Sequence, residues 1–312
     1  MIVSNLALMF SLFILSFSTW AKEPAFYRKL AAYHAPEVNQ GLGHNPRADV
    51  FTRIDFDGDL NFDNNWANVN QAEQAGSFVY YDVIETKAHW FITYGFFYPR
   101  DYAHYCFWWV CHENDFEGMR LTIEKTPDSE FGETVLMESQ AHGRIVYQED
   151  LTFAEAEPVQ KHHVVVMIEK EGHGLHSIND RHPDPQNRVY KYSSNGQVPG
   201  GYELLPLSDL WATRDQVGRG KMWHGTFSYE GNHFSIKKLP SSFGGRKWGV
   251  AGANPPWAWK PLGITKGDWF FDPVQTTCHK IGCLPGMEEG TYLYNPYVGI
   301  TPDSHQVSSV TP

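Results

Sequence analysis

Two carboxylates and a histidine stand close together just ahead of a strand-like stretch. The segment His112-Glu-Asn-Asp-Phe-Glu117 precedes residues 118–124, in which apolar and polar side chains alternate. Since strand side chains repeat every two residues, Asp115 and Glu117 share a face with the apolar members of that stretch. Those members are Met119, Leu121 and Ile123.

If that face points to the core, burying both carboxylates costs several kcal/mol unless something neutralises them. A hard divalent cation such as Ca²⁺, Mg²⁺ or Mn²⁺ does so through oxygen ligands. His112, at the start of the same segment, would lie beside this cation and contact it directly or through water. The alternative is a solvated acidic turn before the strand.

A second histidine lies where two strand-like stretches meet. His142 belongs to the segment Ser139-Gln-Ala-His-Gly143. A histidine beside a glycine at a strand end approaches a metal or a substrate closely. The alternative is a histidine that only caps a turn.

Two other groups invite the same question. Asp55, Asp57 and Asp59 have the oxygen spacing of a calcium turn, but no glutamate closes the loop as in an EF-hand. A plain aspartate-rich turn is the favoured interpretation, and a structural calcium is the alternative. His173 and His176 flank a glycine, so one of them lies near the main site or both are loop histidines.

The cysteines form two pairs of C-x4-C spacing, Cys106 with Cys111 and Cys278 with Cys283. In an exported chain an even number of cysteines predicts disulfides, and we favour the two local bridges among three connectivities. A zinc site is the alternative. The first pair encloses Phe107, Trp108 and Trp109, aromatic residues of the kind that contact membrane interfaces and sugar faces. Packing of these rings under a neighbouring loop explains the run equally well.

The N-terminus predicts export. Residues 6–17 are apolar with serine as the only interruption, and the small residues Ser18-Thr-Trp-Ala21 follow. We expect a signal peptide over residues 1–21 and a secreted, periplasmic or extracellular mature chain of residues 22–312. No Lys or Arg precedes the apolar run. An uncleaved anchor is the alternative, although it needs about 20 apolar residues.

The elements that must position these residues are mostly strands. Alternating or apolar stretches separated by turn residues favour an all-β fold, a single β-sandwich domain with long loops and few short helices. We expect residues 208–216 to be helical and residues 178–201 to form a long surface loop. The expected strands are 77–85, 88–98, 118–124, 134–139, 143–148, 163–168, 223–229 and 233–238. No second apolar segment of membrane-spanning length is present, and a net charge of −11 argues against nucleic acid as a partner.

The region from Trp90 to Glu117 resembles the necrosis-inducing NLP cytolysins. It contains Tyr94-Gly-Phe-Phe-Tyr-Pro-Arg-Asp101 and then a His-x-x-Asp-x-Glu motif, which a related vacuolar-sorting family also has. The family's motif carries Gly, His and Trp where this chain has Cys111, Asn114 and Phe116. The resemblance implies a divalent cation, Ca²⁺ or Mg²⁺, at one edge of a β-sandwich. Its ligands would be Asp101, His112, Asp115, Glu117 and His142.

Three functions follow from these features. The first is a secreted, cation-dependent protein that recognises glycolipid or glycan head groups and is cytolytic. The second is an extracellular module that the cation only stabilises, because a shared fold does not fix function. The third is a metal-dependent ester or phosphoester hydrolase with Glu117 or His142 as base, which ranks last because no nucleophile motif accompanies it.

Overall fold

The computed structural model describes most of the chain. It covers residues 24–60, 64–104, 111–154, 162–194, 199–212, 223–229, 232–238, 256, 268–287 and 292–301, with the backbone alone for His112 and for 223–238. The expected signal peptide, Cys106 and the aromatic run Phe107–Trp109 lie outside these residues.

Strands dominate the described residues, which confirms the mainly β prediction. They are β1 (Glu37–Gly41), β2 (Phe78–Thr86), β3 (His89–Asp101), β4 (His112–Glu124), β5 (Glu133–Ala141), β6 (Arg144–Gln148), β7 (Val165–Ile168), β8 (Leu175–Ser177), β9 (Asn187–Tyr192), β10 (Gly201–Pro206), β11 (Trp223–Tyr229), β12 (Asn232–Lys238) and β13 (Tyr292–Tyr294).

The helices are short. They are α1 (Pro24–Tyr33), α2 (Asn65–Asn68), α3 (Ala72–Ala75), α4 (Leu207–Ala212), α5 (Asp268–Phe271) and α6 (Pro273–Ile281), with 3-10 turns at Val69–Gln71 and Pro296–Val298. Among the described residues, no helix combines the length and the apolar composition needed to cross a bilayer.

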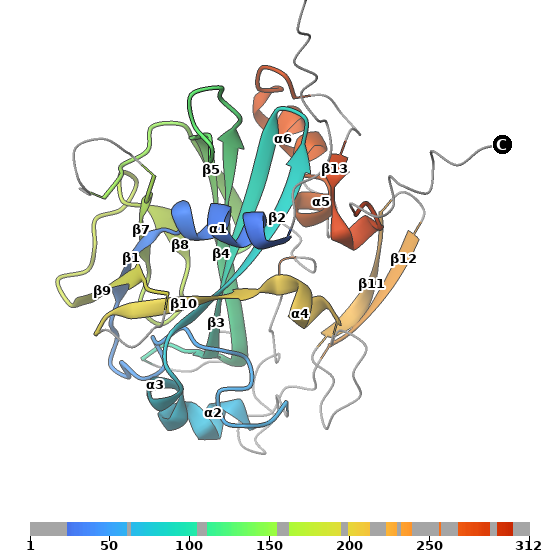
Figure 1. The fold of residues 1–312 in the computed structure, drawn as a ribbon. Coiled ribbons are helices and arrows are strands. Elements are labelled where there is room, and N and C mark those ends of the chain that lie inside the picture. Colours follow the sequence, from blue (N-terminus) through green and yellow to red (C-terminus); the bar gives the residue numbers. More distant parts are fainter. Residues whose placement is uncertain are drawn as a thin grey trace, which may run out of the picture.

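One large sheet forms the body of the molecule (Figure 1). Its strand order is β6-β5-β4-β3-β2-β10-β9-β1-β7-β8, with β13 added beside β2. Most neighbours are antiparallel, whereas β1–β7, β10–β2 and β10–β9 are parallel. The strand at one end of this order, β8, contacts β5 near the other end, so the sheet folds over on itself. The hairpin β11–β12 is a separate two-stranded sheet.

The main core lies between the two halves of this folded sheet. Strands β3 and β4 supply large side chains such as Tyr94 and Met119, and β7 and β10 supply Val166 and Tyr202 from the other half. Helix α1 adds Leu30 to the same cluster. Full burial of such a side chain contributes about 1.5–3 kcal/mol, so this contact holds the halves together.

Strand β4 is buried on both faces. Met119, Leu121 and Ile123 are fully buried in the main core, as the alternation predicts. On the opposite face Arg120 is also buried, and it pairs with Glu138 through two contacts of 2.5 and 2.7 Å. The Arg120 guanidinium lies over the ring of Trp269 in α5. The C-terminal helices therefore cover the second face of β4.

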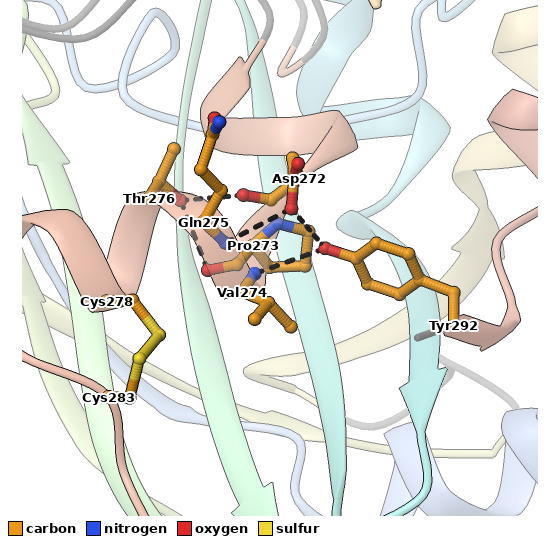
Figure 2. Close-up of a disulfide and its surroundings, with 8 residues drawn as sticks. All are labelled: Asp272, Pro273, Val274, Gln275, Thr276, Cys278, Cys283 and Tyr292. Atoms are coloured by element: carbon orange, nitrogen blue, oxygen red, sulfur yellow. Dashed lines mark hydrogen bonds between the residues drawn. A yellow bond between two sulfur atoms is a disulfide. The ribbon is translucent and has the colours of Figure 1, made fainter. Parts of the chain in front are cut away.

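Helix α6 is fixed at both ends (Figure 2). Asp272 accepts a hydrogen bond from the backbone N–H of Gln275, which caps the start of the helix, and a second one of 2.5 Å from the Tyr292 hydroxyl. At the other end Cys278 and Cys283 form a disulfide, as predicted. Cys111 is disulfide-bonded as well.

Two expectations about local structure are incomplete. Residues 178–201 are not one loop, because β9 lies within them and pairs with β1 and β10. Helix α1 has no counterpart among the expected elements, whereas α4 covers the described part of the expected helix 208–216. Both α1 and β9 owe their place to partners distant in the sequence.

His34 ties the end of α1 to the hairpin before β5. Its Nε2 lies 2.9 Å from the Phe131 carbonyl oxygen and must donate to it, which leaves Nδ1 to accept from the Thr134 hydroxyl at 3.2 Å. The ring is therefore held neutral. Burial, together with the nearby His162 and His163, lowers the pKa of His34 to about 4.

We expect acid to destabilise the protein through His34, and the substitution His34→Gln to reduce that effect. The unfolded chain takes up a proton on His34 near pH 6.5, but the folded chain does so only near pH 4. The free energy of unfolding therefore falls as the pH drops through this window, by about 3 kcal/mol at most from this residue. Thermal unfolding from pH 7 to 4 measures it, with the exposed His182→Gln as control. Equal pH dependence of the two variants would contradict the assignment.

Candidate functional site

The antiparallel pairing of β3 with β4 brings the predicted carboxylates to one end of the sheet. Asp101 pairs with His112 across the two strands, and the positions opposite Tyr98 and Phe96 are Asp115 and Glu117. Asp115 and Glu117 are 6% and 7% exposed, so both carboxylates point inward as the alternation predicts. Asp101 is half-buried at the end of β3.

Of the carboxylates at this end of the sheet, Glu117 is the one with an unsatisfied oxygen among the described residues. Its Oε2 atom is buried and, among the described residues, has no hydrogen-bond partner. Burial raises the pKa of Glu117 well above its usual range, and the negative charges of Asp115 and Asp101 raise it further. A buried oxygen without a partner, next to two more carboxylates, is the arrangement that a hard cation relieves.

Asp115 is held by His173. The His173 ring is fully buried and stacks on Tyr98 with 3.7 Å between the ring centres. Its Nδ1 lies 2.9 Å from Asp115 Oδ2, and its Nε2 lies 3.3 Å from Asp49 Oδ1. Burial alone would lower the pKa of His173, but the hydrogen bond to Asp115 and the close carboxylate of Asp49 outweigh it and raise the pKa to about 9. His173 thus carries a positive charge between two carboxylates.

Asp49 is the site residue that the sequence does not reveal. It is fully buried and accepts hydrogen bonds from the backbone N–H groups of Gly43 and Glu171 and from the Tyr102 hydroxyl. Its partners are separated from it by 6 to 122 positions in the sequence, so no local pattern marks it. Of the two histidines His173 and His176, His173 is the one that lies at the site, because it bonds Asp115.

His142 lies beside the same loop but bonds a different carboxylate. Its Nε2 is 2.7 Å from Glu169, and the side chain is 59% exposed. His176 and Arg181 contact Glu169 too. A Cβ atom at Gly174 would come within 3.0 Å of His142 Nε2, so this glycine allows the close approach of the loop. Glu169, not a β4 carboxylate, is therefore the bonding partner that the structure gives His142.

The cation itself stays a prediction. Among the side chains that the structure describes, no three or more of His, Cys, Asp and Glu are arranged to hold a metal ion as they stand. The side chain of His112 is outside that set, and its backbone lies opposite Asp101. The chemistry of the donor set, in which Asp101, Asp115 and Glu117 offer oxygens, suits Ca²⁺ or Mg²⁺.

The aspartate-rich segment 55–59 forms the expected turn. Gly58 has a φ of 90°, and its N–H bonds the Asp55 carbonyl. Asp55 pairs with Arg53 at 2.5 and 2.8 Å, while Asp57 and Asp59 accept hydrogen bonds from asparagine side chains. The carboxylates thus have protein partners, and calcium at this turn is an untested alternative.

Comparison with known proteins gives a partial likeness. No family model and no curated protein matches the chain. The non-toxic HaNLP3 protein is 17% identical, with a TM-score of 0.35 over 64% of this chain and 86% of that one. A structure described as a toxin fold for microbial attack and plant defense is 13% identical, with a TM-score of 0.37 over 64% and 84%. NLPPya in complex with glucosamine is 15% identical, with a TM-score of 0.34 over 51% and 71%. HaNLP3 and NLPPya carry the name of the family that the motif resembles, and at these identities the likeness bears on the fold alone.

Without added cations, we expect Glu117→Gln to stabilise the protein at neutral pH. A carboxyl whose folded pKa is raised loses stability as the pH rises through that pKa, and an amide does not titrate. A gain of roughly 2–4 °C in the unfolding temperature corresponds to about 1 kcal/mol in a chain of this size. Calorimetry in chelator at pH 5 and pH 8 measures the gain, with the exposed Glu133→Gln as control. A lower unfolding temperature for Glu117→Gln at pH 8 would show that Glu117 has a stabilising partner instead.

Proposed function

We propose that this is a secreted NLP-like protein that binds a divalent cation at the end of β3 and β4. Through that cation it would recognise a glycolipid or glycan head group, with lysis of the membrane as the consequence. The observation that carries the proposal is the buried Oε2 of Glu117, which has no partner in the described part of the chain and lies next to Asp115 and Asp101. The predicted signal peptide and the disulfide of α6 support export.

A cation in this place has coordination positions to spare. Ca²⁺ takes 6–8 oxygen ligands and Mg²⁺ takes six, more than the three carboxylates Asp101, Asp115 and Glu117 supply when each gives one oxygen. The remaining positions go to water or to oxygens of a ligand, and sugar hydroxyls suit them. The protein's part is to hold the carboxylates inward and to keep one side of the cation free.

Polar side chains around the neighbouring loops suit a sugar-bearing partner. His44 lies 2.9 Å from Glu171, and its ring contacts that of His104. His44 and Glu171 are 44% and 24% exposed, so they are open to hydrogen bonds with hydroxyl groups. Glu171 belongs to the loop that carries His173, which joins this polar surface to the carboxylate site.

Hydrolysis is less well supported than binding. A general base has to reach the proton that it removes. His173 is fully buried, and its two ring nitrogens face Asp115 and Asp49. His142 is exposed but bonds Glu169. These positions favour a site that holds a ligand over one that activates water.

We expect the protein to release dye from vesicles that contain glycolipid in the presence of Ca²⁺ or Mg²⁺. Chelator and Glu117→Gln should each reduce the release at least tenfold, because both remove the bridge between carboxylates and head group. The control variant is Glu133→Gln, which should behave as wild type, and vesicles of phosphatidylcholine alone are the lipid control.

Release that ignores chelator, or no binding to any glycolipid, would contradict the proposal. A large fall in unfolding temperature on chelation without binding to vesicles would favour the stabilising cation instead. Turnover of phosphodiester or ester substrates that Glu117→Gln abolishes would favour the hydrolase.

A further inference from the structure

The residue that reaches Asp115 comes from the loop between β7 and β8. His173 is fully buried although it belongs to a loop, and its backbone has a φ of 50°, in the left-handed region that a non-glycine residue seldom adopts. Such a conformation persists only where the surroundings hold it. Here the holding contacts are the Tyr98 ring on its face and a carboxylate near each ring nitrogen.

Asp49 joins three segments around this histidine. Its Oδ2 accepts from the Gly43 N–H and the Tyr102 hydroxyl, each at 2.7 Å. Its Oδ1 accepts from the Glu171 N–H at 2.8 Å and lies 3.3 Å from His173 Nε2. Tyr102 follows Asp101 directly, so the carboxylate of Asp49 connects the end of β3, the loop before β8 and the segment after β1.

Each carboxylate oxygen of Asp115 accepts one hydrogen bond. Oδ2 accepts from His173 Nδ1 at 2.9 Å, and Oδ1 accepts from the Phe116 N–H at 2.9 Å. Both bonds fix the plane of the carboxylate. Each carboxylate oxygen still has a lone pair for another partner.

We propose that Asp49 and His173 are positioning residues for the cation site: Asp49 orients the His173 ring, and the ring fixes the direction in which Asp115 offers its oxygens. The inference rests on the proposed cation site and adds residues that are not ligands. Groups that orient ligands in this way typically change metal affinity by about 10- to 100-fold when they are removed.

Comparing Mg²⁺ with Ca²⁺ affinity separates an orienting role of Asp49 and His173 from the effect of their charges. Mg²⁺ requires nearly ideal octahedral geometry, whereas Ca²⁺ accepts irregular and variable coordination. A carboxylate that is free to rotate therefore weakens Mg²⁺ binding more than Ca²⁺ binding. Loss of a negative charge near the site weakens both alike, because both ions carry the same charge.

Calorimetric titration of the full chain with Mg²⁺ and with Ca²⁺ tests the inference. Asp49→Asn should weaken Mg²⁺ binding at least tenfold and Ca²⁺ binding clearly less. The matched control is Asp184→Asn, which removes a carboxylate that pairs with Lys170 at the surface and should leave both affinities unchanged. The unfolding temperature of each variant in chelator is measured alongside.

A second substitution keeps the test decisive if Asp49→Asn does not fold. His173→Asn retains a donor close to the Nδ1 position, which faces Asp115, but has no donor at the Nε2 position near Asp49, and it should show the same larger loss for Mg²⁺. Unchanged affinities with a lower unfolding temperature would overturn the inference, because the pair would then be structural only. An equal loss for the two ions would overturn it as well, because charge alone would explain it. If the wild-type chain binds neither ion, the proposed function itself fails, and this inference fails with it.

Discussion

Strand β4 has no face toward water, so each charged side chain in it must find its partner inside the protein. Arg120 finds Glu138, in a pair that is almost fully buried. Glu113 accepts the backbone N–H of Trp66, and Asp115 is neutralised by His173. Among the charged side chains of β4, Glu117 has a buried oxygen, Oε2, that finds no hydrogen-bond partner in the described residues. Glu117 is therefore the charged residue of β4 whose burial is least compensated by the described residues.

Glu117 differs in its contacts from the paired charged residues of β4. Buried charges that serve only the fold are usually paired, because an unpaired one costs several kcal/mol. The protein pairs Arg120 on one face of β4 and Asp115 on the other, whereas the described part of the chain offers no ion pair to Glu117. Two further carboxylates raise the pKa of Glu117 instead. A raised pKa is how a buried carboxyl avoids the cost of an unpaired charge, and burial raises the pKa of Asp82 in β2 in the same way, to about 7.

The sequence predicts the inward direction of the carboxylates because period-two alternation is a local property of a strand. Asp115 and Glu117 lie an even number of positions from Met119, so they share its buried face. The same alternation does not predict that Arg120, on the opposite face of β4, is also buried. The helices that cover this face follow some 150 positions later in the sequence. Asp49 is beyond prediction for the same reason, since its role exists only once three loops have met. Between His173 and His176, only the path of the loop decides which ring turns inward.

Two of the three departures from the NLP motif, Asn114 and Phe116, lie within β4 and replace no carboxylate, and the third, Cys111, directly precedes the strand. Phe116 is buried in the cluster under the C-terminal helices, and a Cβ atom at Gly95 would lie 2.4 Å from its ring. Asn114 is buried with a φ of 62° and accepts a hydrogen bond from Asn65 of α2. Phe116 alternates with Asp115 and Glu117 along the strand and so points away from them, and the side chain of Asn114 bonds α2. These two substitutions therefore alter how β4 is supported from behind, while the carboxylate face keeps the residues on which cation binding would depend.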